Sequence, residues 1–296
     1  MDERWHRAEV DSPVPFRWNL AKREQLGRLI GDDPWPELTY LDELREVSAK
    51  VVARAGDADL VFVGRSPEKL FDYVSGVFGE ARAKERLTLF QLSHRDSRAD
   101  GPSEMVWLGG YLAAERLLPE DILERDRPIR FVDLVAWGGT FHFVLALMQW
   151  WAEECCVPWT ECARRIGFIG LTRQEKNSPN TWRWYQKPPW TTKARDIPAS
   201  SVSISSLMWD VLCNDEPKVT HSFPNRLWGT NQPAIPPRDE RKLQGLRFAV
   251  ALYDKGSERA ERQNFAAALA QQHEFKQPFV RSLAHCLKSG RLDQSQ

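Results

Sequence analysis

Short runs of apolar residues alternate with amphipathic stretches through the middle of this chain. A continuous apolar run indicates a strand buried on both faces, whereas apolar residues three or four positions apart indicate one face of a helix. The runs predict strands at residues 60–63, 86–93, 129–135 and 165–172, and helical patterns follow the first three of them. This alternation predicts an α/β fold whose core is a parallel sheet with helices on both faces.

The two ends of the chain have helical patterns only. The spacing of apolar residues at 19–30 and 38–55 predicts a helical segment at the N-terminus, which we call the lead-in. The last C-terminal helix is expected to end at Gly290. Between the core and the C-terminal helices, residues 201–212 predict one strand and a short helix within a polar, Trp-rich region. We divide the chain into a helical lead-in (1–56), an α/β core (57–172), a Trp-rich hood or connecting region (173–237) and a C-terminal helical extension (238–296).

The composition is that of a globular protein without a net charge. Hydrophobic residues make up 42% of the 296 positions and charged residues 28%, and the 41 basic residues equal the 41 acidic ones. Because there is no overall basic field, nucleic acid is a less favoured partner, and any anion site would have to be local.

The apolar pattern predicts neither a secretory leader nor a membrane anchor. The N-terminal stretch MDERWHRAEVDSPVPF is charged and has no apolar core. The longest apolar run, residues 141–151, is shorter than the roughly 20 residues that cross a bilayer. We therefore expect a cytoplasmic protein with no membrane partner.

The cysteines have neither the count nor the spacing of a disulfide framework or a zinc site. We therefore expect no metal site among them and reduced thiols throughout. The five residues are Cys155, Cys156, Cys162, Cys213 and Cys286.

The stretch FVDLVAWGGTFHFVL is the first candidate binding element, because an apolar strand runs into Gly138, Gly139 and Thr140 and then into a helix. Glycines permit positive φ and close approach of a ligand, and a helix N-terminus offers free N–H groups and partial positive charge to an anion. Asp133, near the end of the strand, can accept hydrogen bonds from a sugar diol or hold a metal ion. The alternative is an ordinary tight turn in which Asp133 caps or hydrogen-bonds locally.

The stretch LVFVGRSPEKL is the second candidate element, and it also follows a predicted strand. Gly64 permits a tight turn, and Arg65 can donate two hydrogen bonds to a pair of phosphate oxygens. Ser66 and Lys69 are placed to assist it. The alternative is that this loop only caps the next helix and that Arg65 is solvated.

Together these stretches resemble the phosphoribosyl-diphosphate (PRPP) binding motif and the pyrophosphate loop of type I phosphoribosyltransferases, over residues 57–172. The resemblance implies binding of PRPP with Mg²⁺. It implies that Asp133 and residues 136–140, which we call the phosphate loop, hold the ribose 5-phosphate. It also implies that the earlier loop, which begins at Gly64, holds the pyrophosphate. The ribose-phosphate residues would be Asp133, Ala136, Trp137, Gly138, Gly139 and Thr140, and the pyrophosphate residues Gly64, Arg65, Ser66 and Lys69.

The leading hypothesis is therefore an enzyme that transfers a phosphoribosyl group between pyrophosphate and a nitrogenous base, with Arg65 and Asp133 as its catalytic residues. The family usually has two adjacent acids, and Val132 occupies the first position here. This difference favours a second hypothesis, in which the same pocket senses a nucleotide without catalysis and other surfaces contact a protein or nucleic acid. A Rossmann-like enzyme is the third, disfavoured because no GxGxxG follows the first strand.

Two further segments remain open in function. The polar loop at residues 94–103 falls where the family has a mobile active-site loop. Residues 180–190, NTWRWYQKPPW, could stack on nucleic-acid bases, cover a nucleobase as a hood, or seal the sheet edge against the C-terminal helices. His142, after the phosphate loop, is expected to be a packing residue rather than a ligand contact.

Overall fold

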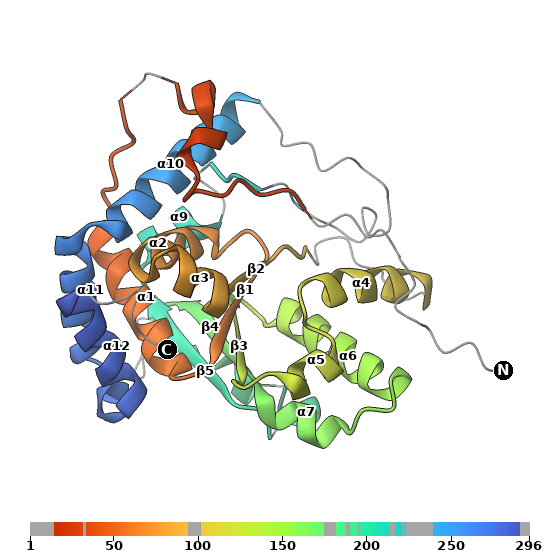
Figure 1. Cartoon of the computed structure of the whole chain (residues 1–296). Coiled ribbons are helices and arrows are strands. Elements are labelled where there is room, and N and C mark those ends of the chain that lie inside the picture. The colour runs from red at the N-terminus through yellow and green to blue at the C-terminus, as the bar shows by residue number, and fades with distance from the viewer. Residues whose placement is uncertain are drawn as a thin grey trace.

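A computed structural model describes most of the chain (Figure 1). The described residues are 15–31, 34–93, 102–174, 182–187, 190–194, 196–213, 217–220, 222 and 239–290.

The core is a five-stranded sheet in which every neighbouring pair of strands is parallel, so the predicted α/β class is confirmed. The strand order is β2-β1-β3-β4-β5. The chain thus leaves β1 to build one edge of the sheet and then returns to the other side of β1 to build the rest. The strands are β1 (Asp59–Val63), β2 (Leu87–Phe90), β3 (Ile129–Leu134), β4 (Ile166–Arg173) and β5 (Ala199–Ile204).

Helices cover both faces of the sheet (Figure 1). On one face lie α1 (Leu41–Ala55), α2 (Glu68–Phe78), α9 (Ser206–Cys213), α11 (Arg259–Ala270) and α12 (Pro278–Ser289). On the other lie α4 (Pro102–Ala114), α5 (Pro119–Glu124), α6 (Gly139–Glu154) and α7 (Trp159–Arg165). The chain also forms α3 (Glu80–Arg86), α8 (Trp190–Lys193), α10 (Glu240–Ser257) and short 3-10 turns at Arg23–Gln25, Gly27–Ile30, Trp184–Gln186 and His273–Lys276.

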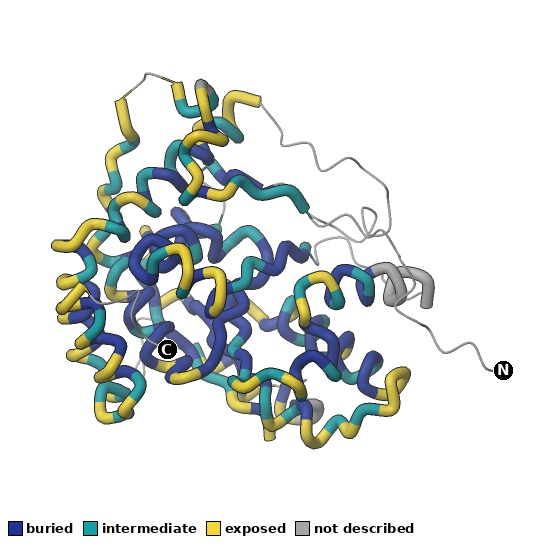
Figure 2. Tube along the Cα trace, in the orientation of Figure 1, coloured by how far each residue is buried: buried dark blue, intermediate teal, exposed yellow. Residues whose placement is uncertain are grey.

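Successive residues of the strands serve the two cores in alternation. In β1, Leu60 and Phe62 belong to the core under α1 and α2, whereas Val61 and Val63 belong to the core under α6. This alternation explains why the strand is apolar at every position from Leu60 to Val63, as the sequence pattern indicates. Figure 2 shows the buried segments running through the middle of the molecule, with exposed segments on its outer helices.

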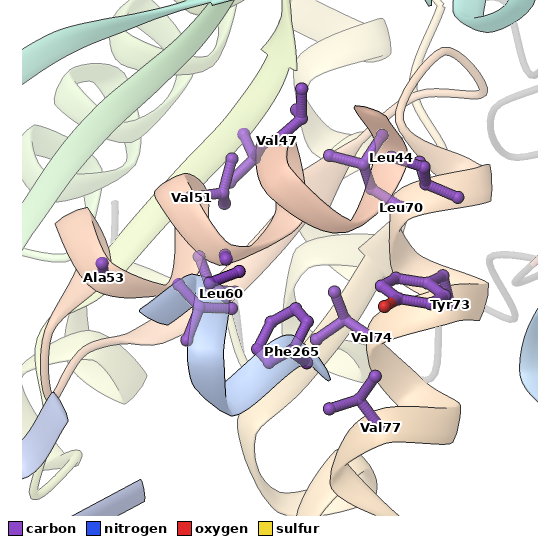
Figure 3. Packing of buried hydrophobic residues seen from close by; sticks show 14 of the residues in the cluster. Leu44, Val47, Val51, Ala53, Leu60, Leu70, Tyr73, Val74, Val77 and Phe265 are labelled. Carbon is purple, nitrogen blue, oxygen red and sulfur yellow. The ribbon is translucent and has the colours of Figure 1, made fainter. Parts of the chain in front are cut away.

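The C-terminal helices are part of the first core rather than a separate layer. Figure 3 shows Phe265 of α11 among side chains of α1, α2 and β1, including Val74 and Leu60. A polar contact joins the same elements, because the buried carboxylate of Glu261 accepts hydrogen bonds from Arg45 Nε at 2.6 Å and from the Tyr73 hydroxyl at 2.6 Å. Residues more than 200 positions apart in the chain are therefore bonded within the protein interior.

Several elements differ from the sequence prediction. The pattern at residues 19–30 forms two 3-10 turns instead of one helix, because Gly27 takes a positive φ of 49° between them. The strand predicted within 201–212 is β5, which joins the sheet from the Trp-rich region. The short helices α3, α5 and α7 have too few residues for a periodic pattern to reveal them. Among the helices in the described part of the chain, none is long and apolar enough to span a bilayer.

Replacing Glu261 by alanine is expected to lower the free energy of unfolding by about 2–4 kcal/mol, because Tyr73 and Arg45 would lose their shared buried acceptor. Urea denaturation measures this change. Glu46→Ala is the matched control, since Glu46 pairs with Lys50 on the exposed surface at 3.7 Å and should change stability by less than about 1 kcal/mol. Equal small losses in both variants would contradict a structural role for the buried contact.

Candidate functional site

A cavity of about 460 Å³ opens at the carboxyl ends of β1 and β3. Parallel sheets bind ligands where the strand order reverses, and here the reversal falls between these two neighbouring strands. The volume lies in the range of small-molecule sites. The structure brings both predicted loops to this cavity: its lining includes Gly64, Arg65, Ser66, Asp133, Ala136, Trp137, Gly138, Gly139 and Thr140.

The second loop presents the N-terminus of α6 to the cavity. Gly138 precedes the helix in the left-handed region, with φ 82° and ψ 14°, and its carbonyl accepts from the N–H of His142 at 2.9 Å. An added Cβ at Gly138 would also lie 3.1 Å from the Trp184 ring. A glycine is therefore required by backbone conformation and by space. The first N–H groups of a helix have no acceptor within it, so those of Gly139 and Thr140 are available to an anion.

Asp133 is a buried acid on the wall of the same cavity, with 6% of its surface exposed. Its Oδ1 accepts from the N–H of Leu134 at 2.7 Å, and the Thr140 hydroxyl also hydrogen-bonds the carboxyl group. Burial raises the pKa of Asp133 to about 8, although both hydrogen bonds act in the opposite direction. Within the described part of the chain, no basic side chain forms an ion pair with it. The group is therefore a neutral acid near pH 7, able to donate one hydrogen bond and accept others.

The first loop turns sharply at Gly64. This residue has a φ of 73°, and an added Cβ would lie 2.8 Å from the carbonyl oxygen of Leu92. Arg65 follows it on the cavity wall, half-buried, with Nη1 3.5 Å from the carbonyl oxygen of Thr220. The next helix, α2, begins at Glu68 with Pro67 at the N-cap position and no side-chain cap. Ser66 is thus a loop residue on the cavity wall rather than the helix cap.

Lys69 does not line the cavity with the other predicted pyrophosphate residues. Its side chain is buried between α2 and α10, where the ammonium group lies 4.5 Å from the centre of the Phe248 ring and 5.9 Å from that of Tyr40. The first turn of α2 carries Lys69 away from the loop, because α10 packs along this side of the helix.

Lys218 is a cavity residue that the sequence reasoning missed. It is 7% exposed, and its Nζ donates to the carbonyl oxygen of Leu212 at 2.7 Å. Burial lowers the pKa of Lys218 to about 8; Glu68 acts against this, and the nearby charges of Lys69 and Arg65 reinforce it. The surrounding sequence, NDEPKVTHS, contains no motif or periodicity that marks the residue.

A second cavity of about 380 Å³ adjoins the first, and both are lined by Val135, Ala136, Trp137 and Trp209. Its other lining residues are Arg173, Gln174 and Trp182. We call this second cavity the aromatic cleft. Trp137 is 84% exposed there, and its ring meets that of Trp182 edge-on at 6.0 Å.

The tryptophans after β4 divide between cleft and core. Trp182 Nε1 donates to the carbonyl oxygen of Ala136 at 2.9 Å, which ties the Trp-rich region to the phosphate loop. Trp184 and Trp190 are buried with Phe141 and Phe168 under α6. They pack on the sheet face opposite to α11 and α12, so they do not seal the edge against the C-terminal helices.

Two other predictions concern His142 and the polar loop at residues 94–103. His142 lies 5.3 Å from the Trp190 ring and does not line either cavity, in keeping with a packing residue. Of the predicted mobile loop, residues 94–101 lie outside the described residues; Ser93, the described residue before them, lines the cavity.

Comparisons with models of known protein families, with curated proteins and with solved structures found no match to this chain. In the described ranges, no three His, Cys, Asp or Glu side chains are grouped so that they could hold a metal ion. Any functional assignment therefore depends on the geometry and chemistry of the cavity.

Asp133→Asn is expected to stabilise the protein by about 1–4 kcal/mol near pH 8 and to flatten its pH dependence. With its pKa raised from 3.8 to about 8, folded Asp133 holds a proton that the unfolded chain has released, so its contribution to stability falls as pH rises through this window. Thermal unfolding at pH 5, 7 and 9 measures the effect. The exposed Asp126→Asn is the control. Parallel pH profiles in wild type and Asp133→Asn would be inconsistent with a raised pKa.

Proposed function

We propose that the cavity binds a phosphorylated ribose, as PRPP or as a ribonucleotide. One observation carries the proposal: the N-terminus of α6 and the Arg65 guanidinium come from neighbouring strand ends to one cavity at the reversal of strand order. Helix N-termini and arginine forks are both common phosphate donors. The resemblance of the two loops to those of type I phosphoribosyltransferases supports the same ligand.

Each side chain has a role that its environment favours. The N–H groups of Gly139 and Thr140 would hold the 5-phosphate, with the Thr140 hydroxyl as a further donor. The Asp133 carboxyl would bind ribose hydroxyls, which can donate and accept as a neutral acid requires. Arg65 would bind a second anionic group, with Ser66 beside it.

If the protein is an enzyme, the reaction would be phosphoribosyl transfer between pyrophosphate and a nitrogenous base. Asp133 is the single carboxyl group among the described residues of the cavity wall, and it is protonated near pH 7. The Mg²⁺ that the family resemblance implies would therefore be held mainly by the phosphate oxygens of the ligand, and it would supply positive charge to the leaving pyrophosphate. Catalysis would come from positioning and charge stabilisation rather than from a protein nucleophile.

The second candidate is nucleotide binding without catalysis, and the aromatic cleft favours it. This cleft continues the cavity and offers the exposed face of Trp137, where a nucleobase joined to a bound ribose could stack. Val132, at the position of the family's first acid, is fully buried in the core under α1 and α2 and supplies no second carboxylate to the site.

Arg65→Met is expected to weaken binding of PRPP at least tenfold, because a charged donor to the phosphate is lost. Isothermal calorimetry with PRPP and Mg²⁺ measures the affinity, and Thr140→Ala should weaken it by a smaller factor. Arg164→Met, an exposed arginine on α7, is the matched control. Absence of wild-type binding to PRPP, ribose 5-phosphate and ribonucleotides would sink the proposed function.

Trp137→Ala is expected to reduce affinity for ribonucleoside monophosphates by about tenfold or more, through loss of a stacking contact of about 1–3 kcal/mol. Affinity for ribose 5-phosphate, which has no base, should stay within a factor of two of wild type. Isothermal calorimetry with each of the two ligands measures the affinities. The exposed Trp35→Ala serves as control. Equal losses for both ligands would instead indicate a disturbed phosphate loop.

A further inference from the structure

Residues 217–220, which we call the strap, place Lys218 on the wall of the cavity. The strap is held from α10, where Lys242 Nζ donates to the carbonyl oxygens of Lys218 at 3.1 Å and Thr220 at 2.6 Å. The strap is also contacted by Gln91, whose Nε2 lies 3.2 Å from the Thr220 hydroxyl oxygen. Side chains of other elements therefore hold the strap at Lys218 and at Thr220.

Glu68 provides the most extensive of these contacts. It is 2% exposed, and it accepts from the N–H of Val219 at 2.7 Å, from the N–H of Thr220 at 3.4 Å and from the Thr220 hydroxyl. Arg17 donates to it at 3.3 Å and also pairs with Asp72. Burial raises the pKa of Glu68, but Arg17, Lys218 and the hydrogen bonds outweigh burial and leave the pKa below its usual value. An ionised carboxylate thus organises the strap.

We propose that Lys218 binds the second anionic group of the ligand together with Arg65, and that Glu68 positions it by holding residues 219 and 220. This inference rests on the proposed phosphorylated-ribose site. Among the described residues, the ammonium group of Lys218 has one acceptor, Leu212 O, which leaves two of its three donors for a ligand.

The surrounding charges support an anion rather than a neutral group at this point. Burial is the main cause of the lowered pKa of Lys218 and of Lys242; the charges of Lys69 and Arg65 add to it at Lys218, and that of Arg65 adds to it at Lys242. Glu68 is the acid that opposes this crowding, and its oxygens are already bonded to the strap and to Arg17. A phosphate or pyrophosphate between Lys218 and Arg65 would relieve the repulsion and favour the charged form of the lysine.

The protein groups that could bind a ligand differ in chemical kind between the two walls of the cavity. Arg65 lies just before α2 and Lys218 lies on the strap that Glu68 of α2 holds, whereas Asp133 lies on β3 and Thr140 at the start of α6. The cavity thus offers side-chain cations on one wall and helix N–H groups on the other. A ligand with two separated anionic groups would satisfy both walls.

The experiment is calorimetric titration of the full chain with inorganic pyrophosphate and, separately, inorganic phosphate. Lys218→Met should weaken pyrophosphate binding at least tenfold, and Lys218→Arg should recover much of the loss by restoring the charge. Lys255→Met, a partly exposed lysine paired with Glu258 on the surface of α10, is the matched control and should bind as wild type does. Equal affinity in wild type and Lys218→Met would overturn the role of Lys218 while leaving the proposed function intact. Absence of pyrophosphate binding by wild type would overturn the inference about the second anionic group, and the titration with PRPP, ribose 5-phosphate and ribonucleotides decides the proposed function separately.

The positioning role of Glu68 requires a coupling measurement. Glu68→Gln should weaken pyrophosphate binding several-fold in the wild-type background but add little in the Lys218→Met background, because it acts through the lysine. Thr220→Val is a milder variant that removes one of the donors to Glu68 and keeps the carboxylate, and it should show the same coupling. A loss of stability without a change in affinity, or equal losses in both backgrounds, would overturn the positioning role.

The pH dependence of the binding affinity distinguishes a role of the Lys218 charge from a purely structural role of this residue. Lys218 faces Glu68, Lys69, Arg65 and Cys213, its strap is held by Lys242, and Asp133 titrates elsewhere in the same cavity. Wild-type affinity should fall between about pH 7 and 9, as Lys218 loses its proton and Asp133 ionises. Lys218→Arg should retain only the part due to Asp133, since arginine stays charged. Identical profiles in the two proteins would argue against a titrating lysine in the site.

Discussion

The neighbouring position of β1 and β3 is the constraint on which the site depends. Each parallel strand must be followed by a crossover, and here the chain turns to α2 on one face after β1 and to α6 on the other face after β3. Because the two connections diverge, their first residues cannot pack against each other, and a cavity remains at the strand ends. Gly64 and Gly138 both have a positive φ, which lets the chain turn tightly toward opposite faces of the sheet.

The ionisable groups around this cavity are accommodated in three different ways. Glu68 remains charged because backbone N–H groups, a hydroxyl and Arg17 meet its oxygens. The pKa of Asp133 is raised to about 8, because burial outweighs two hydrogen bonds. The pKa of Lys218 is lowered to about 8 by burial and by neighbouring cations. Fully bonded buried charges such as Glu68 build structure, whereas Asp133 and Lys218 keep capacity for a ligand.

The sequence predicted the elements well where the apolar pattern was long or was punctuated by glycine. The four predicted strands, the helix after the Gly-Gly turn and the C-terminal helix ending at Gly290 all appear, with shifts of a few residues at their ends. The prediction was wrong at residues 19–30, where a left-handed glycine interrupts the helical spacing. Lys69, which the sequence grouped with the pyrophosphate loop, has its ammonium group over the Phe248 ring of α10 and is not among the described residues that line the cavity.

By itself, the sequence determined the parallel α/β class and the two loops at strand ends, because strand burial and turn conformation are local properties of apolar runs and glycines. Only the tertiary structure decided that β5 joins the sheet, that the Trp-rich region divides into a core and a cleft, and that Lys218 lies on the cavity wall. These features depend on contacts between distant residues, such as Glu68 with Val219 and Trp182 with Ala136. No local pattern encodes them, since each partner looks ordinary within its own stretch of sequence.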